Sequence, residues 1–278
     1  MSGAGGGWSA LRYAGLSLVA AILLLPIYWL IMSSFRPAED IFRFAGAFGI
    51  DTLIPRVLTL ENYEQIFAGS FPRALFNSLF VCVATVLFGV IVNSMAGFAF
   101  AVFDFPLKKP LFVIVLLSFM MPFESIVIPL YTLMRTLNWT DTYAALILPE
   151  VAGGLIIFLF RQFFAAIPKE IYEAARIDGA NWWQIYLRMT MPLSGPTVAT
   201  ASLMMFIHQW DAFFWPLVAT SSADLAVVQV AIARNMTLEQ ANWGALFASA
   251  STAVLVAAIP FSMLQRYYVR TVTTNADR

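Results

Sequence analysis

Glu173-Ala174-Ala175-Arg176-Ile177-Asp178-Gly179, followed after nine intervening residues by Met189-Thr190-Met191-Pro192, lies between two strongly apolar stretches of this 278-residue chain. A compact charged segment of this kind does nothing for solvation by lipid, so its presence in an apolar chain indicates contact with a soluble partner. The pattern therefore predicts a docking site on one aqueous face of a membrane protein.

The residue types around this stretch predict a helix, a turn and a second helix. Pro168 can begin a helix, and Lys169, Glu173 and Arg176 then share one face at i, i+4 and i+7. Gly179 follows where a left-handed backbone would turn the chain. The second element should contain the bulky residues Trp182, Trp183, Ile185 and Tyr186. An ordinary amphipathic helix at the membrane surface is the alternative.

The composition indicates a protein that crosses the membrane several times. Hydrophobic residues make up 60% of the chain and charged residues 12%, and the mean hydropathy is +0.78. Because about 20 apolar residues are needed to span the hydrocarbon, the sequence predicts an all-α fold with six spans. They are Tyr13 to Ser34, Ala74 to Phe103, Leu111 to Leu133, Tyr143 to Phe164, Pro196 to Val218 and Trp243 to Gln265.

The distribution of Lys and Arg predicts the orientation, because cytoplasmic loops are enriched in these residues. The side that holds both termini has ten: Arg12, Lys108, Lys109, Arg161, Lys169, Arg176, Arg188, Arg266, Arg270 and Arg278. The other side has six: Arg36, Arg43, Arg56, Arg73, Arg135 and Arg234. Both termini are therefore expected in the cytoplasm, and the first span is expected to be retained and not cleaved as a signal peptide.

The chain reads as one transmembrane domain, residues 1–278, with two aqueous excursions. The first is an external loop, residues 35–73, in which Leu60 to Phe67 should form a short helix. This loop is expected either to meet an extracytoplasmic receptor or to pack as a lid on its own spans. The second is the cytoplasmic segment 165–192 that contains Glu173.

Several function classes are excluded by residue counts. No Gly-x-x-x-x-Gly-Lys phosphate loop occurs, so the chain lacks that route to ATP binding. The single His208 and the single Cys82 argue against metal sites and disulfides. A net charge of zero gives no argument for nucleic-acid binding. The chain is expected to have no catalytic residues, no metal and no cofactor of its own.

Ionisable groups within the spans mark candidate positions on a transport path, because charges at membrane depth are costly. On the fifth span Met204, His208, Asp211 and Trp215 would share one helical face. Aromatic rings with a carboxylate and an imidazole suit a sugar. A structural hydrogen bond between His208 and Asp211 is the alternative.

The third span offers a similar row, Met120, Glu124, Val127 and Tyr131, with Pro122 and Pro129 expected to break the helix around the carboxylate. Glu124 and Tyr131 are therefore further path candidates. Capping of freed backbone amides is the alternative role for Glu124. The polar residues of the second span, Asn77, Asn93 and Ser94, are expected to bond between helices.

The segment at Glu173 resembles the EAA loop of the permeases of binding-protein-dependent ABC importers, in which Glu-Ala-Ala, a later Gly and an Ile-x-Leu-Pro run form the coupling helix. Met189 and Met191 replace the Ile and Leu. The resemblance implies that Glu173 pairs with a basic residue of an ATPase, that Ala174 and Ala175 permit close contact, and that Gly179 makes the turn. Asp178 and Pro192 are the remaining residues that the resemblance assigns to coupling with the ATPase.

Further runs resemble the carbohydrate permeases of this family, in particular the shorter, six-span subunit of maltose-type importers. They are Glu61-Asn62-Tyr63, Phe76-Asn77-Ser78-Leu79, Ile128-Pro129-Leu130-Tyr131, Leu146-Ile147-Leu148-Pro149 and Gln209-Trp210-Asp211. The resemblance implies the fold of a type I ABC importer permease in the bacterial inner membrane. It also implies alternating access and four kinds of partner: a homologous second permease, two ATPase subunits that bind ATP and Mg, an extracytoplasmic binding protein and membrane lipid.

Three alternative functions stay open at this point. Glycerol phosphate or a polyol is the alternative cargo to a sugar or oligosaccharide. An ion-coupled secondary transporter could use Glu124 and Asp211 as ion sites but has no use for an EAA-type loop. A scaffold that does not transport would explain the docking segment but not the aligned polar residues of the fifth span.

Overall fold

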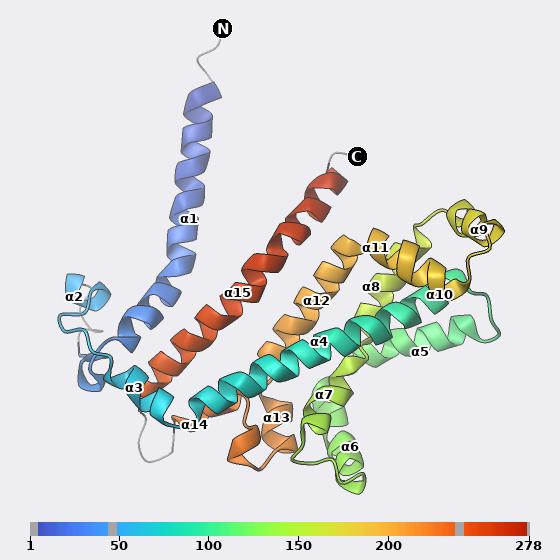
Figure 1. The fold of residues 1–278 in the computed structure, drawn as a ribbon. Helices are drawn as coiled ribbons and strands as arrows, with labels where there is room; N and C mark the ends of the chain where they lie inside the picture. The colour runs from blue at the N-terminus through green and yellow to red at the C-terminus, as the bar shows by residue number, and fades with distance from the viewer. Residues whose placement is uncertain (1–4, 44–48, 237–241, 277–278) are drawn as a thin grey trace. The chain divides into compact units, whose positions relative to one another are not determined.

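The computed structural model describes residues 5–43, 49–236 and 242–276, and these residues form helices and connecting turns without a strand. The chain divides into two compact units. Unit 1 comprises Met1–Pro72 and Ala231–Leu255, and unit 2 comprises Arg73–Val230 and Val256–Arg278. Figure 1 shows the helices of the chain with their labels.

The α-helices follow one another along the chain with short connections. They are α1 (Gly5–Ser34), α2 (Ile50–Leu53), α3 (Glu61–Ala68), α4 (Phe71–Val102), α5 (Lys108–Met120), α6 (Phe123–Thr136), α7 (Tyr143–Val151), α8 (Gly154–Ala165), α9 (Lys169–Ile177), α10 (Trp182–Ile185), α11 (Met191–Leu193), α12 (Gly195–Trp210), α13 (Phe214–Ala219), α14 (Val228–Arg234) and α15 (Trp243–Ala276). A π-helical turn, Tyr186–Thr190, joins α10 to α11.

Three described helices are long and apolar enough to cross a membrane: Leu11–Ser34 in α1, α4, and Trp243–Met263 in α15. Two bent pairs bring the number to five at most, α5 with α6 at 102° and α7 with α8 at 41°. The predicted third and fourth spans are these bent pairs, and the predicted fifth span is divided between α12 and α13. The predicted count of six spans is therefore not confirmed.

Unit 1 is organised around Asn62 of α3, which confirms the short helix predicted in the external loop. The buried Asn62 amide donates to the carbonyl oxygens of Ser34 and Arg36 at 2.9 and 2.7 Å, at the end of α1. Gly244 of α15 approaches the same side chain so closely that a Cβ there would lie 2.1 Å from Asn62 Oδ1. The amide thus joins α1, α3 and α15 within this unit.

In unit 2, α4 makes the polar contacts between helices that the sequence predicted. Asn77 Nδ2 donates to the carbonyl oxygens of Asp224 and Ala226 at 2.7 and 2.9 Å, and Asn77 Oδ1 accepts from the Tyr143 hydroxyl at 2.7 Å. Asn93 Nδ2 donates to Val151 O at 2.7 Å, and its Oδ1 accepts from the Gly153 amide at 2.9 Å. Asn93 therefore satisfies backbone groups that the break between α7 and α8 leaves without helical partners.

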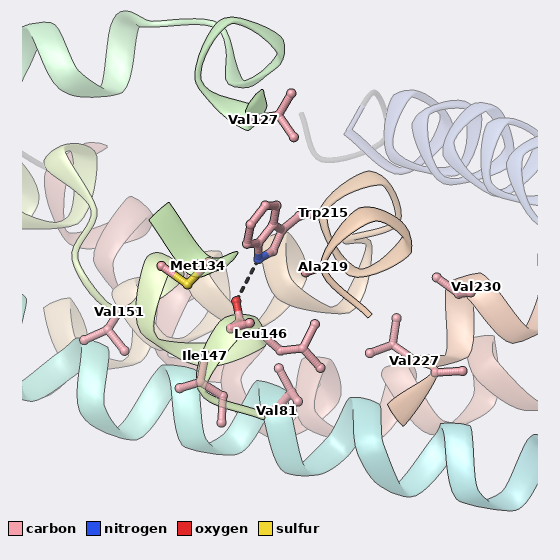
Figure 2. Packing of buried hydrophobic residues seen from close by; sticks show 12 residues of the cluster. Val81, Val127, Met134, Leu146, Ile147, Val151, Trp215, Ala219, Val227 and Val230 are labelled. Atoms are coloured by element: carbon pink, nitrogen blue, oxygen red, sulfur yellow. Dashed lines mark hydrogen bonds between the residues drawn. The ribbon is translucent and has the colours of Figure 1, made fainter. Parts of the chain in front are cut away.

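Apolar side chains of unit 2 form two clusters at different places along α4. One contains Val81, Val127, Met134, Leu146 and Trp215 among its members (Figure 2). The other gathers aromatic residues around Phe98, Phe160 and Phe164 and includes Tyr172 and Tyr186 from the segment 165–192. Cys82 is fully buried in α4, as expected for a small hydrophobic residue.

Candidate functional site

The predicted helix at Glu173 is α9, and a buried tyrosine attaches it to unit 2. Pro168 directly precedes the helix, as the sequence predicts. Tyr172 is buried, its ring centroid lies 6.3 Å from that of Phe98, and its hydroxyl donates to Phe164 O at 3.4 Å. Burial raises the pKa of the Tyr172 phenol, which keeps the hydroxyl neutral and able to donate.

The turn after α9 depends on Gly179. Its φ is +84°, in the left-handed region that glycine adopts without steric cost. The Gly179 amide donates to Arg176 O at 3.1 Å and the Ala180 amide to Ala175 O at 3.0 Å, which together form a Schellman motif. Arg176 Nη1 also donates to Ala180 O at 2.9 Å, so the side chain and the backbone fix the same turn.

The second element begins with a capping box. Gln184 N donates to Asn181 Oδ1 and Asn181 N donates to Gln184 Oε1, both at 2.8 Å. Ile185 and Tyr186 are buried, and the Trp182 ring packs edge-on against Phe103 with centroids 4.8 Å apart. This confirms the predicted apolar second element. Residues 165–192, here called the coupling segment, are thus held against the C-terminal end of α4 by aromatic side chains.

A hydroxyl pair adds a polar contact between the coupling segment and α4. Ser94 Oγ and the Tyr186 hydroxyl are hydrogen-bonded at 2.7 Å, and both side chains are buried. The sequence predicted a contact between helices for Ser94 but not its partner Tyr186, and it did not predict the role of Tyr172. A single aromatic residue inside an amphipathic helix gave no signal that distinguishes an anchor from an exposed side chain.

The docking candidates themselves are exposed. Glu173, Ala174, Asp178 and Pro192 lie on the surface of the isolated chain. Glu173 forms no hydrogen bond or ion pair with the part of the chain that the structure describes. Ala175 and Gly179 line a shallow hollow of about 360 Å³ together with Asp178, Ala180, Gln184, Ile185, Arg188 and Met189. The segment therefore presents both an unpaired carboxylate on α9 and a hollow lined in part by small residues.

The predicted row on the fifth span is wrong at its far end. The helix α12 ends at Trp210, and Asp211 occupies its C-cap. Trp215 belongs to α13, is buried, and donates from Nε1 to Ala145 O at 2.8 Å (Figure 2). A helical periodicity across residues 204–215 does not exist because the chain leaves the helix at residues 211–213. Trp215 is therefore a core residue of this conformation.

His208 pairs with a residue that sequence analysis did not select for the path. Its Nε2 lies 3.1 Å from Glu150 Oε2 of α7, where hydrogen bonding to Asp211 was the predicted structural alternative. The His208 side chain is 73% exposed and that of Glu150 is 19% exposed. Glu150 is the last residue but one of α7, next to the break before α8, and His208 lies in the last turn of α12. The pair thus lies where two helices break.

The predicted row on the third span is also interrupted. Met120 ends α5, and Pro122 precedes α6 at the bend, so Met120 and Glu124 are not on one helix face. The predicted break at Pro122 is confirmed, whereas Pro129 lies inside a continuous α6. Glu124 is exposed in the first turn of α6, and Tyr131 packs against the cluster that contains Trp215. We call α6, α7, α12 and α13 the broken-helix region.

The chain matches a known family over most of its length. The family described as "Binding-protein-dependent transport system inner membrane component" matches residues 86–274. The chain is 34% identical to the arabinooligosaccharides transport system permease protein AraQ of Halalkalibacterium halodurans, over 94% of this chain and 93% of that protein. It is 30% identical to the sn-glycerol-3-phosphate transport system permease protein UgpE of Agrobacterium fabrum, over 92% of this chain and 94% of that protein.

A solved structure shares the fold. A bacterial ABC transporter that imports the acidic polysaccharide alginate contains a chain with a TM-score of 0.81, 21% sequence identity, and coverage of 96% of this chain and 99% of that one. Together with the family match, these relations show that the chain belongs to the family of binding-protein-dependent transport system inner membrane components. It is a non-catalytic, multi-pass permease subunit of an ABC importer, as the EAA-type motif indicated.

Proposed function

We propose that the chain forms half of the translocation path of an ATP-driven importer for a sugar or oligosaccharide and works by alternating access. The printed names of its relatives support this cargo class, since they include permeases for arabinooligosaccharides and lactose. Glycerol phosphate is the second candidate cargo, and it is favoured by the UgpE relatives at 30–32% identity. The ion-coupled and scaffold alternatives lose their support because the family is one of binding-protein-dependent transport components.

The observation that carries the proposal is the exposed, unpaired face of α9. In the proposed complex Glu173 pairs with a basic residue of an ATPase subunit, Ala174 permits close approach, and the hollow beside Ala175 and Gly179 receives an ATPase side chain. Movement of the ATPases is then passed to α4 through Tyr172 and the aromatic contacts of the coupling segment. Asp178 and Pro192 belong to the same docking surface.

The proposed assembly places the permease in a bacterial inner membrane with both termini in the cytoplasm. Its partners are a homologous second permease, two ATPase subunits that bind ATP and Mg, and an extracytoplasmic binding protein. Support for a binding protein comes from the family description and from the alginate transporter solved with its pentasaccharide-bound periplasmic protein. In unit 2, Figure 1 draws the α4–α5 connection and α9 at one end, which agrees with the grouping of Lys108, Lys109 and Lys169 on one side. Arg278, which also contributes to the predicted orientation, lies outside the described residues.

The path itself is proposed to run along the exposed polar groups of the broken-helix region. His208, Asp211 and Glu124 present an imidazole and carboxylates that can bond sugar hydroxyls, and Glu150 orients the imidazole. Tyr131 and Trp215, which are partly or fully covered here, would contact cargo only in another state of the transport cycle. Charged groups at membrane depth facing lipid would be costly, so a water-filled path is the favourable surrounding.

Site-directed cross-linking tests the docking surface. A cysteine in place of Ile177, which is 86% exposed at the end of α9, is introduced in a Cys82→Ala background and given a short photoreactive group. In membranes that contain the whole transporter we expect an adduct with the ATPase subunit. Gln65→Cys, exposed on α3 of the external loop, is the matched control and should give none. No ATPase adduct from position 177, or equal adducts from both positions, would contradict the proposal.

The cargo is tested through the cognate binding protein and not through the permease. Thermal-shift screening of that protein against neutral oligosaccharides, polyols and glycerol phosphate should give the largest stabilisation with a saccharide, because a ligand that binds the native state raises its stability. The same saccharide should then stimulate ATP hydrolysis by the reconstituted transporter. Stimulation only by glycerol phosphate would replace the proposed cargo while leaving the permease assignment intact.

A further inference from the structure

The external loop exposes an unusual number of aliphatic side chains between residues 50 and 60. Ile50 is 78% exposed and Leu58 is 70% exposed. Four more large aliphatic residues of this stretch are also exposed: Leu53, Ile54, Val57 and Leu60. Single exposed apolar residues are common on proteins, but a run of this kind marks a surface that another apolar phase covers.

Both ends of this stretch are tied to the two residues that follow α1. Arg36 is buried, and its guanidinium donates from Nη1 to Asp51 O at 2.9 Å and from Nη2 to Thr52 O at 2.8 Å. At the other end the Thr59 amide donates to Phe35 O at 2.8 Å. Burying a guanidinium is costly, and charge-assisted hydrogen bonds offset that cost. The apolar stretch is therefore held at the point where α1 ends.

The length of the candidate span in α1 is sufficient to bring the end of this helix to a membrane surface. The candidate span Leu11–Ser34 has 24 residues, which is about 36 Å of helix and slightly exceeds a hydrocarbon core of about 30 Å. Near the end of this span, the ring centroid of Trp29 lies 6.3 Å from that of Phe42. The Phe42 centroid in turn lies 4.9 Å from that of Trp243, the first residue of α15. Tryptophan side chains are enriched at the interface between the hydrocarbon of a membrane and water.

We propose that residues 50–60 form an interfacial anchor, with their aliphatic side chains inserted between the lipid head groups of the outer leaflet beside α1. The occupant of this surface is lipid because the stretch continues the apolar surface of α1, whose most apolar 18-residue window is not buried by other parts of the chain. The Asp51–Arg56 ion pair lies at head-group level, where water and charge are present. The proposal rests on the membrane location of the chain and is independent of the cargo.

A nitroxide depth measurement tests the anchor in the complete transporter reconstituted in lipid nanodiscs. Single cysteines replace Ile54 and Leu58 in separate Cys82→Ala variants and carry the spin label, so that one poorly folding variant does not decide the result. Leu16→Cys, exposed on α1, is the lipid reference, and Gln65→Cys on α3 is the water reference. Collision rates with oxygen, which concentrates in lipid, and with a water-soluble nickel chelate are measured at each position.

The anchor predicts an oxygen-to-nickel collision ratio at positions 54 and 58 that is shifted well above the value at 65 and remains below the value at 16. A ratio equal to that at 65 would show that the stretch lies in water and would overturn the proposal. Low collision rates with both reagents would show that protein covers the stretch, either the second permease or the binding protein, and would overturn it as well. Measuring the collision rates both without and with the loaded binding protein identifies which of the two covers the stretch.

Discussion

The coupling segment and the broken-helix region of unit 2 place their polar groups in opposite ways. In the coupling segment the buried contacts are mainly aromatic, and the charged residue Glu173 is left exposed without a partner among the described residues. In the broken-helix region polar groups are bonded within the chain, as with Trp215 to Ala145 and His208 to Glu150. We propose that another subunit completes the first surface, whereas several side chains of the second already have partners within the chain.

This difference predicts two kinds of mutational effect. Removing Glu173 takes away a contact that forms only in the complex, so the isolated permease should stay folded while coupling is lost. Removing a buried, internally bonded side chain of the broken-helix region such as Trp215 leaves an unfilled position inside the chain, so stability should fall before transport is affected.

Trp215→Ala should cause the largest loss of stability. The side chain is 4% exposed and fills the cluster with Val127 and Met134, so its truncation should cost about 3–5 kcal/mol. Trp215→Phe keeps most of the ring but removes the hydrogen bond to Ala145 O, which should cost about 1 kcal/mol. Thermal unfolding of the purified permease measures both. Equal stability of wild type and Trp215→Ala would show that this packing is absent in solution.

The effect of a substitution at Gly179 should depend on how well the new residue tolerates a positive φ. No atom lies within 4 Å of a Cβ built at this position, so strain comes from the backbone alone. An L-residue in the left-handed region costs about 1–2 kcal/mol, and Val should be worse than Ala, with Asn the best tolerated. Uptake coupled to ATP hydrolysis should therefore be highest for Gly179→Asn, lower for Gly179→Ala and lowest for Gly179→Val.

Gly195→Ala is the matched control for that series, since its Cβ also meets no atom within 4 Å and it begins a helix without a positive φ. It should leave uptake unchanged. Equal uptake by Gly179→Val and wild type would mean that the turn is not needed for docking.

The Glu150–His208 pair should contribute little to stability, because partly exposed ion pairs contribute about 0–1 kcal/mol. Glu150→Gln, which retains a hydrogen-bond partner for the imidazole, should leave assembly intact and reduce uptake less than His208→Ala. Leu148→Ala, exposed on the same helix, is the control and should transport normally. Loss of co-purification with the second permease in both variants would assign the pair to a subunit contact and not to the path.

The sequence predicted the coupling segment well because its signals are local. Pro168, Gly179 and the apolar pair Ile185 and Tyr186 act through their own backbone geometry or through burial of adjacent residues. The polar contacts of Asn77, Asn93 and Ser94 were also predictable, since such groups inside an apolar helix require partners. Their particular partners depend on the packing of distant helices and were not predictable.

The broken-helix region was predicted poorly because periodicity assumes one continuous helix. The row from Met204 to Trp215 fails at residues 211–213, where no proline marks the interruption. Pro129 was expected to break α6 but lies inside it, while Pro122 coincides with the 102° bend. Glu150 was not selected because its pairing with His208 joins residues 58 positions apart.

Carboxylates one turn apart on α9 provide the most direct test of the central claim, that Glu173 couples the permease to an ATPase. Uptake and ATP hydrolysis are measured on the same proteoliposomes for Glu173→Ala and for Glu170→Ala, which removes an exposed carboxylate of the first turn outside the motif. We expect Glu173→Ala to lose most of its uptake per ATP hydrolysed, or to release the ATPase, with unchanged thermal stability of the permease, and Glu170→Ala to resemble wild type. Wild-type uptake and wild-type stimulation of hydrolysis by the binding protein in Glu173→Ala would contradict the account.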